Sequence, residues 1–209
     1  MVKVKICGIT NYEDAALAVD LGVDALGFIF APSPRRITPE KARKIIAALP
    51  PLVTIIGVFV DEDERHLLTI ADYCGLQVFQ FHGNESPEFC GKFKPRAIKS
   101  FRLKESSDLS SLSAYRDQVR AFHLDTFQTG LFGGTGRTFP WHLAKEAKAY
   151  SLPLILSGGL THLNIRQAIR DVHPYAVDVS SGIEVRPGKK DAELMRQLVE
   201  IIKGVNPND

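Results

Sequence analysis

Two glycine-containing turns near the end of the sequence have the residue types and spacing of a phosphate site. Each follows a short apolar segment, 153–156 or 176–179, and leads toward a helical pattern. Glycines let backbone N–H groups approach a ligand, and N–H groups near helix N-termini attract anions. Either turn alone is a weak signal, because glycines after a strand more often form only a tight turn. Together they predict a phosphorylated small-molecule ligand, held by Gly158, Gly159, Ser180, Ser181 and Gly182.

Four polar residues at the ends of apolar segments could carry out acid–base chemistry: Cys7, His82, Asp125 and Asp178. A thiolate can act as a nucleophile or general base, and a carboxyl group can act as a general acid. An arbitrary cysteine is more often a small buried apolar residue, but the position of Cys7 at a strand end sets it apart. His82 could be an acid or base, or only a polar lining residue. Asp125 is less suited to a local helix cap, because the next helical pattern begins only near Pro140.

Two arginines follow the second apolar segment, in a loop that prolines make stiff. The planar guanidinium group can bind a carboxylate through two parallel hydrogen bonds. Arg36 directly precedes the apolar Ile37. We therefore expect Arg36 to face a ligand and Arg35 to be solvated.

A glycine-rich loop at 130–138 invites comparison with a nucleotide-binding P-loop. The comparison fails, because Leu131 lies where the first glycine belongs and Arg137 replaces the lysine. Glycines permit hinge motion, and closure of a loop excludes water from a site. The loop is therefore interpreted as a lid, with an ordinary surface loop as the alternative.

The segments that position these residues alternate between apolar strands and helical patterns. The strand patterns begin near Val2, Asp24, Val53, Gln77, Arg96, Ala121, Pro153 and Ala176. Strict alternation implies an all-parallel α/β sheet, either a closed barrel or an open doubly wound sheet. The paired turns at the end and the polar strand ends favour a (β/α)₈ TIM barrel, a single domain over residues 1–209.

Capping residues predict where several of the helices begin and end. Asn11, Thr38 and Asp61 are expected to cap the first three helices, since their side chains can accept hydrogen bonds from free backbone N–H groups. Gly75 is expected to end the third helix. The last helix is predicted from about Asp191 to Lys203.

The composition is that of a globular protein. Of the 209 residues, 44% are hydrophobic and 24% are charged, and the formal net charge is +2. This charge is too small to indicate nucleic-acid or membrane partners, and no apolar run approaches the ~20 residues that span a bilayer. Three cysteines without a CxxC pair, and no leader pattern, predict a cytoplasmic protein. No residue set has the spacing of a metal site.

Motifs over nearly the whole sequence resemble those of the phosphoribosylanthranilate isomerase family of the tryptophan pathway. The opening motif Lys5–Thr10 and the closing motif Val177–Glu184 are together highly specific. Further matches lie, in order, at 27–30, 33–36, 57–60, 80–83, 124–126, 133–136 and 156–160. The departures are minor: Phe81 stands where leucine is usual, and Arg137 where lysine is common.

The resemblance implies an Amadori rearrangement of N-(5-phosphoribosyl)anthranilate to a 1-deoxyribulose 5-phosphate. It gives Asp125 the role of the acid that opens the furanose ring and Cys7 the role of the base that removes the proton on C2. It makes Arg36 the residue that binds the anthranilate carboxylate. His82, Asp178 and the two turns are the remaining substrate contacts. The chemistry requires no cofactor or metal, and the expected assembly is a monomer or a homodimer.

Two alternatives stay open from the sequence. A histidine-pathway isomerase performs the same rearrangement, but it is expected to have an aspartate where this sequence has Cys7. A phosphosugar-binding barrel without catalysis has no need of Cys7, Asp125 and Arg36 together. A turnover assay separates the enzyme from the binding protein.

Overall fold

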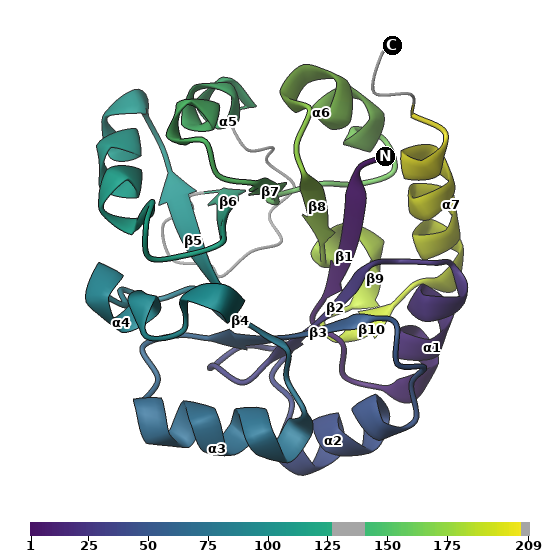
Figure 1. Cartoon of the computed structure of the whole chain (residues 1–209). Helices are drawn as coiled ribbons and strands as arrows, with labels where there is room; N and C mark the ends of the chain where they lie inside the picture. The colour runs from purple at the N-terminus through teal and green to yellow at the C-terminus, as the bar shows by residue number, and fades with distance from the viewer. Residues whose placement is uncertain (127–140, 206–209) are drawn as a thin grey trace.

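Eight parallel strands close into a barrel in the computed structural model of this chain, which describes residues 1–126 and 141–205 (Figure 1). The strands are β1 (Lys3–Cys7), β2 (Ala25–Ile29), β3 (Thr54–Phe59), β4 (Val78–Phe81), β5 (Ala97–Leu103), β6 (Ala121–Thr126), β7 (Leu154–Leu156) and β8 (Ala176–Val179). They pair in chain order, and β1 also pairs with β8. The predicted strand starts are confirmed to within one residue, and the barrel is the arrangement found.

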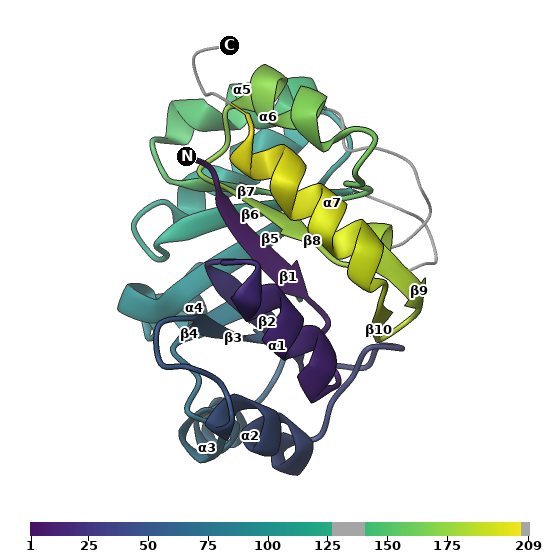
Figure 2. The ribbon, with the colours of Figure 1, turned by 90° about the vertical axis from the view of Figure 1, so that its right-hand side faces the viewer.

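Helices surround the barrel (Figure 1). They are α1 (Tyr12–Asp20), α2 (Pro39–Ala47), α3 (Glu64–Cys74), α4 (Pro87–Gly91), α5 (Trp141–Ala147), α6 (Ile165–Val172) and α7 (Ala192–Lys203). As predicted, Asn11, Thr38 and Asp191 accept backbone N–H hydrogen bonds at the N-termini of α1, α2 and α7. Gly75 ends α3 in the left-handed conformation, with φ 72°. Figure 2 shows α7 next to the seam where β1 meets β8.

The third helix begins later than predicted, because its N-cap is Asp63 and not Asp61. Asp63 Oδ1 accepts hydrogen bonds from the N–H groups of Arg65 and His66, at 3.0 and 3.1 Å. Asp61 has φ 49°, and its carboxylate accepts a hydrogen bond from the N–H of Asn84 at 2.6 Å. The prediction for Asp61 is therefore wrong: this residue joins the loop after β3 to the loop after β4.

Two elements differ from a simple strand–helix alternation. The connection between β5 and β6 is a 3₁₀ helix, Ser106–Tyr115. Its serine hydroxyls donate to carbonyls three residues earlier, as Ser110 does to Ser107 at 2.9 Å, and such bonds compete with the α-helical ladder. After β8 comes an antiparallel hairpin of β9 (Glu184–Arg186) and β10 (Lys189–Lys190), which the sequence patterns did not indicate.

Side chains fill the barrel in layers, because alternate residues of each strand point inward. The layer near the amino ends of the strands is apolar and consists of Ala25, Ile56, Ile98, Ala121, Ile155 and Ala176. The next layer is polar, and its buried members are Lys5, Gln80, Ser100, His123 and Asp178. The outward-facing residues belong to the main apolar core that the helices cover. A polar layer inside a barrel needs internal partners, and it lies directly beneath the carboxyl ends of the strands.

Candidate active site

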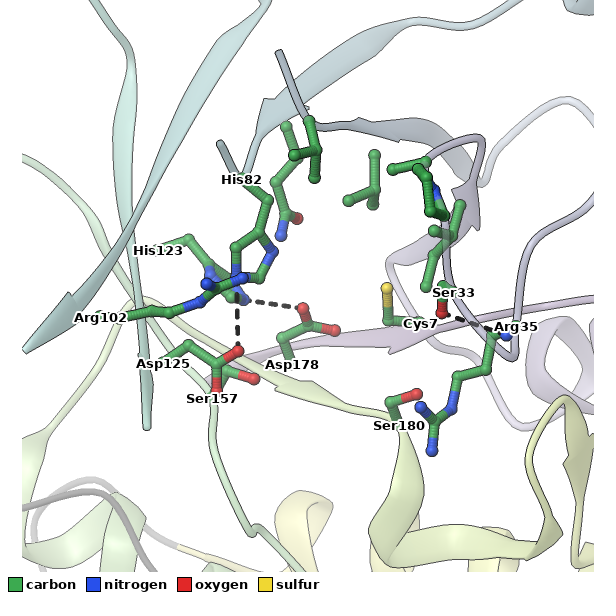
Figure 3. Close-up of a pocket in the computed structure, with 16 residues that line it drawn as sticks. Cys7, Ser33, Arg35, His82, Arg102, His123, Asp125, Ser157, Asp178 and Ser180 are labelled. Carbon is green, nitrogen blue, oxygen red and sulfur yellow. Dashed lines mark hydrogen bonds and ion pairs between the residues drawn. The ribbon is translucent and has the colours of Figure 1, made fainter. Parts of the chain in front are cut away.

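A pocket at the carboxyl ends of the strands collects polar side chains from most of the barrel (Figure 3). The polar residues that line it are Cys7, Ser33, Arg35, Gln80, His82, Arg102, His123, Asp125, Ser157, Asp178 and Ser180. Among the residues predicted from the sequence, Cys7, His82, Asp125, Asp178 and Ser180 thus lie around one cavity. In a barrel of this kind, active sites lie at this end.

The thiol of Cys7 is held at the end of β1, and its sulfur points into the pocket (Figure 3). Gly27, its register partner on β2, makes room for it, since a Cβ at Gly27 would lie 2.7 Å from Cys7 Sγ. The residue is 7% exposed. Burial raises the pKa of the Cys7 thiol, although the ammonium groups of Lys5 and Lys190 act in the opposite direction.

A buried ion network lies beneath the thiol and joins β1, β8 and β6. Lys5 Nζ donates a hydrogen bond to Asp178 Oδ2 at 2.6 Å, and His123 Nε2 lies 2.9 Å from the same oxygen. Burial acts to raise the pKa of Asp178, but Lys5 and His123 outweigh it and hold this pKa well below its usual range. Asp178 is therefore ionised in the folded protein, and it holds two neighbouring side chains in place.

The carboxyl group of Asp125 ends β6 on the other side of the pocket, next to His82 (Figure 3). His82 Nε2 lies 3.5 Å from Asp125 Oδ2. Burial lowers the pKa of His82 despite this neighbour, so the imidazole is neutral near pH 7. A buried ion pair after β4 supports the loop that carries His82: Lys99 Nζ lies 3.1 Å from Glu85 Oε2, and Glu85 accepts the N–H of Gly83.

The two arginines after β2 differ in burial, and the prediction that Arg35 is solvated is wrong. Arg36 is exposed and is not one of the residues that line the pocket. Arg35 lines the pocket and is only 8% exposed. Its Nε and Nη2 atoms donate to the carboxylate of Glu184 at 2.7 to 3.0 Å. The loop turns at Ser33, which accepts the Arg36 N–H on its carbonyl and the Arg35 N–H on its hydroxyl, and this turn directs the two side chains to different sides.

The two predicted phosphate turns lie against each other above β7 and β8. Gly158 and Gly159 have φ values of 88° and 64°, which L side chains rarely adopt. A Cβ on Gly182 would collide with the carbonyl oxygen of Leu160, so glycine is required where the turns meet. Of the two turns, Ser157 and Ser180 line the pocket described above. The segment Ser181–Ile183 forms a short 3₁₀ helix, whereas α6 begins only at Ile165.

Several residues in the pocket or directly beneath it were missed in the sequence, although a regular signal marks some of them. Lys5, Gln80 and His123 precede Cys7, His82 and Asp125 by two positions. Residues two apart on a strand face the same side, so each predicted residue had an inward neighbour one layer deeper. Glu184 and Lys190 gave no such signal, because they belong to the hairpin after β8.

Three further predictions concern the glycine-rich loop, metal ions and membrane-spanning helices. The glycine-rich loop at 130–138, interpreted as a lid, lies outside the described residues. Within residues 1–126 and 141–205, no group of three or more His, Cys, Asp and Glu side chains is arranged to hold a metal ion. None of the helices in this described part is both long and apolar enough to cross a membrane.

The closed barrel, with a polar pocket at the carboxyl ends of its strands, has the architecture of a TIM-barrel enzyme. Residues 4–201 match the protein family described as PRAI, N-(5'-phosphoribosyl)anthranilate (PRA) isomerase. The chain belongs to this family, which confirms the resemblance noted in its motifs.

Individual relatives match over nearly their whole length. The N-(5'-phosphoribosyl)anthranilate isomerase of Pelobacter propionicus is 53% identical over 204 residues, which are 97% of this chain and 96% of the relative. The solved structure of the Thermotoga maritima isomerase has a TM-score of 0.91 and 44% identity, and covers 98% of this chain and 100% of that one. A solved isomerase in complex with reduced 1-(o-carboxyphenylamino)-1-deoxyribulose 5-phosphate has a TM-score of 0.88 and 42% identity, with the same coverage.

Proposed function

We propose that this chain catalyses the reaction of its family with Cys7 as the general base and Asp125 as the general acid. The chain is an isomerase of tryptophan biosynthesis, and it converts N-(5-phosphoribosyl)anthranilate into 1-(2-carboxyphenylamino)-1-deoxyribulose 5-phosphate. The observation that supports the two roles is that a thiol and a carboxyl group, on β1 and β6, line one pocket at the carboxyl ends of the strands (Figure 3).

The first step needs an acid at the furanose oxygen. Asp125 donates a proton to this oxygen as the bond from C1 to oxygen breaks, and the nitrogen lone pair forms the C=N bond of a protonated Schiff base. The carboxyl group must therefore be protonated when the substrate binds. His82 lies 3.5 Å from Asp125 and is neutral. Because the imidazole carries no positive charge, it does not favour the ionised form of the Asp125 carboxyl group.

The second step needs a base at C2 of the opened sugar. The positive nitrogen makes the proton on C2 acidic, and the Cys7 thiolate removes it. The electrons of the C–H bond form the C1=C2 bond of an enolamine, and the nitrogen becomes neutral. Movement of a proton from the 2-hydroxyl group to C1 then yields the ketone. Separate positions for acid and base let the environment adjust their proton affinities independently.

The two charged ends of the substrate are assigned to different groups. We assign the carboxylate of the anthranilate ring to Arg36. Arg35 already donates to the buried carboxylate of Glu184, whereas the exposed guanidinium group of Arg36 has no ion-pair partner among the described residues. We assign the phosphate to the two turns, at Gly158, Gly159, Ser180, Ser181 and Gly182. His82 and Asp178 stay among the proposed substrate contacts.

The activity itself is tested by following the fluorescence of phosphoribosylanthranilate that is generated in situ. Purified protein should consume it at a rate proportional to enzyme concentration. A folded protein that binds the reduced product but shows no turnover would establish the non-catalytic alternative. We also propose a cytoplasmic location, which suits three free thiols, and a monomer or homodimer. A solved structure shows monomers generated from the Thermotoga maritima isomerase, and that isomerase is described as dimeric.

Replacing Arg36 with alanine should weaken binding of the reduced product by about 1.5–3 kcal/mol, the range for hydrogen bonds to charged groups. Arg120→Ala is the control, because Arg120 is exposed and lies before β6, at the opposite end of the barrel. Its affinity should equal that of the wild type in isothermal titration calorimetry. Unchanged binding in the Arg36 variant would mean that another group holds the carboxylate, with Arg35 the first candidate.

Replacing Gly159 with aspartate should weaken product binding by at least about tenfold, or about 1.4 kcal/mol, because it places a negative charge beside the proposed phosphate site. The variant should still fold, since aspartate and asparagine tolerate the left-handed conformation of this residue (φ 64°) better than most side chains. Gly159→Asn has the same shape without the charge, and it should bind more tightly than the aspartate variant. Equal affinities for the two variants would mean that the phosphate lies elsewhere.

A further inference from the structure

Lys5 is a buried cation that the two chemical steps do not use. Its side chain is 3% exposed, and its ammonium group is fixed by the hydrogen bond of 2.6 Å to Asp178. Burial acts to lower the pKa of Lys5, but the negative charges of Asp178 and of an ionised Cys7 outweigh it and raise this pKa. Lys5 therefore carries its charge in the folded protein. A buried charge is usually paired with a group of opposite charge.

The geometry of β1 and β2 brings Lys5 next to Cys7. The two residues are two positions apart on β1, so their side chains face the same interior. A Cβ at Gly27 would lie 2.7 Å from Cys7 Sγ and 3.1 Å from Lys5 Cε. The thiol and the end of the lysine side chain thus lie together over the space that this glycine leaves open.

Other charged groups also face the thiol, and their balance matters. Asp178, on β8, is an anion whose charge acts on the thiol, but it is paired with both Lys5 and His123. Lys190, on β10, donates to the Cys7 carbonyl oxygen at 2.6 Å and is paired with Glu184. Arg35 lines the same pocket and is also paired with Glu184. Lys5 is therefore the cation that reaches the thiol from its own strand.

We propose that Lys5 is a positioning residue that acts through Cys7: its ammonium group pairs with the Cys7 thiolate and so makes a buried thiol usable as a base. This inference rests on the proposed role of Cys7 in the reaction. A buried thiolate is unfavourable unless a positive charge lies beside it. When the C2 proton passes to Sγ, the thiol becomes neutral, and Lys5 keeps its own proton and its bond to Asp178.

The test measures the reactivity of Cys7 without substrate. Iodoacetamide alkylates the thiolate form of cysteine. Peptide mass spectrometry measures the extent of alkylation at Cys7 separately from that at Cys74 and Cys90. The pH at which half-maximal alkylation occurs should rise by at least about one unit in Lys5→Met, because a neighbouring charge shifts a pKa by about 1–3 units. The turnover rate at pH 7 should fall by at least about tenfold. Lys3→Met is the matched control, since Lys3 lies on the same strand but is exposed and pairs with Asp24.

A second variant keeps the test decisive if Lys5→Met does not fold. Asp178→Asn removes the competing anion, so the charge of Lys5 acts on the thiolate alone and the alkylation midpoint should fall. A folded Lys5→Met protein with the wild-type alkylation profile would overturn the proposal, as would an unchanged or raised midpoint in Asp178→Asn. If Cys7 is not the base, the alkylation shifts persist while Cys7→Ala retains turnover, so the two failures are distinguishable.

Discussion

The variant Cys7→Ala should fold and bind the reduced product, but its kcat should be lower than that of the wild type by about 10²–10⁴-fold, the usual contribution of a positioned base. Alanine is smaller than cysteine and fits the space over Gly27, so the barrel has no reason to rearrange. Steady-state turnover and calorimetric product binding, measured on the same preparation, give the two quantities. Cys7→Ser should be nearly as inactive, because a hydroxyl is a much weaker base than a thiolate at neutral pH.

Cys74→Ala is the control for loss of a buried thiol as such, since Cys74 lies on α3. Its kcat should be that of the wild type. Because burial raises the pKa of Cys7 and only the thiolate accepts the proton, kcat/KM of the wild type should rise with pH across the neutral range. Wild-type turnover in Cys7→Ala would remove the thiol from the mechanism.

The variant Asp125→Asn should also lose about 10²–10⁴-fold in kcat while its affinity for the reduced product changes little. Asparagine keeps the size of the side chain and much of its hydrogen bonding, but it cannot deliver a proton to the furanose oxygen. The product is already ring-opened, so its binding does not depend on that proton. Rapid-mixing fluorescence of substrate consumption, combined with product titration, separates the two effects.

Asp117→Asn is a suitable control, because Asp117 is exposed and lies before β6. The opposite result for Asp125→Asn, weaker product binding with kcat preserved, would make Asp125 a substrate contact. The acid would then have to be another group at the same position. His82 is the first candidate, since it lies 3.5 Å from the Asp125 carboxylate and lines the same pocket.

The barrel and the members of its mouth could be predicted because they follow from short-range patterns. Alternating apolar strands and helix caps fixed the order of the elements, and the ends of parallel strands in a barrel necessarily meet. Cys7, His82, Asp125 and Asp178 were found by this reasoning alone. The partners of Asp178 in the deeper polar layer were missed, because Lys5 and His123 each look like ordinary residues within a strand. Their partnership with Asp178 is visible only in the closed barrel, where β1 lies beside β8 and His123 reaches Asp178 from β6 across the interior.

The burial of Arg35 could not be predicted from sequence for a different reason. The direction of a side chain in an irregular loop depends on each backbone turn, and no periodic pattern reports it. Here the turn at Ser33 and the carboxylate of Glu184, on a hairpin 149 residues later in the chain, hold Arg35 in a buried ion pair. The cap of α3 was misplaced similarly, because Asp61 and Asp63 are both plausible caps, and only the loop after β4 distinguishes them.

The strand that carries Lys5 and Cys7 is the first to be synthesised, yet its neighbour β8 is the last strand of the barrel. Until β8 arrives, one edge of β1 has unpaired backbone groups, which are a template for incorrect pairing in an emerging chain. The hydrogen bond from Lys5 to Asp178 joins residues 173 positions apart, so it forms only when the final strand inserts. Completion of the fold and completion of the site are thus one event, and a nascent chain that lacks β8 has neither.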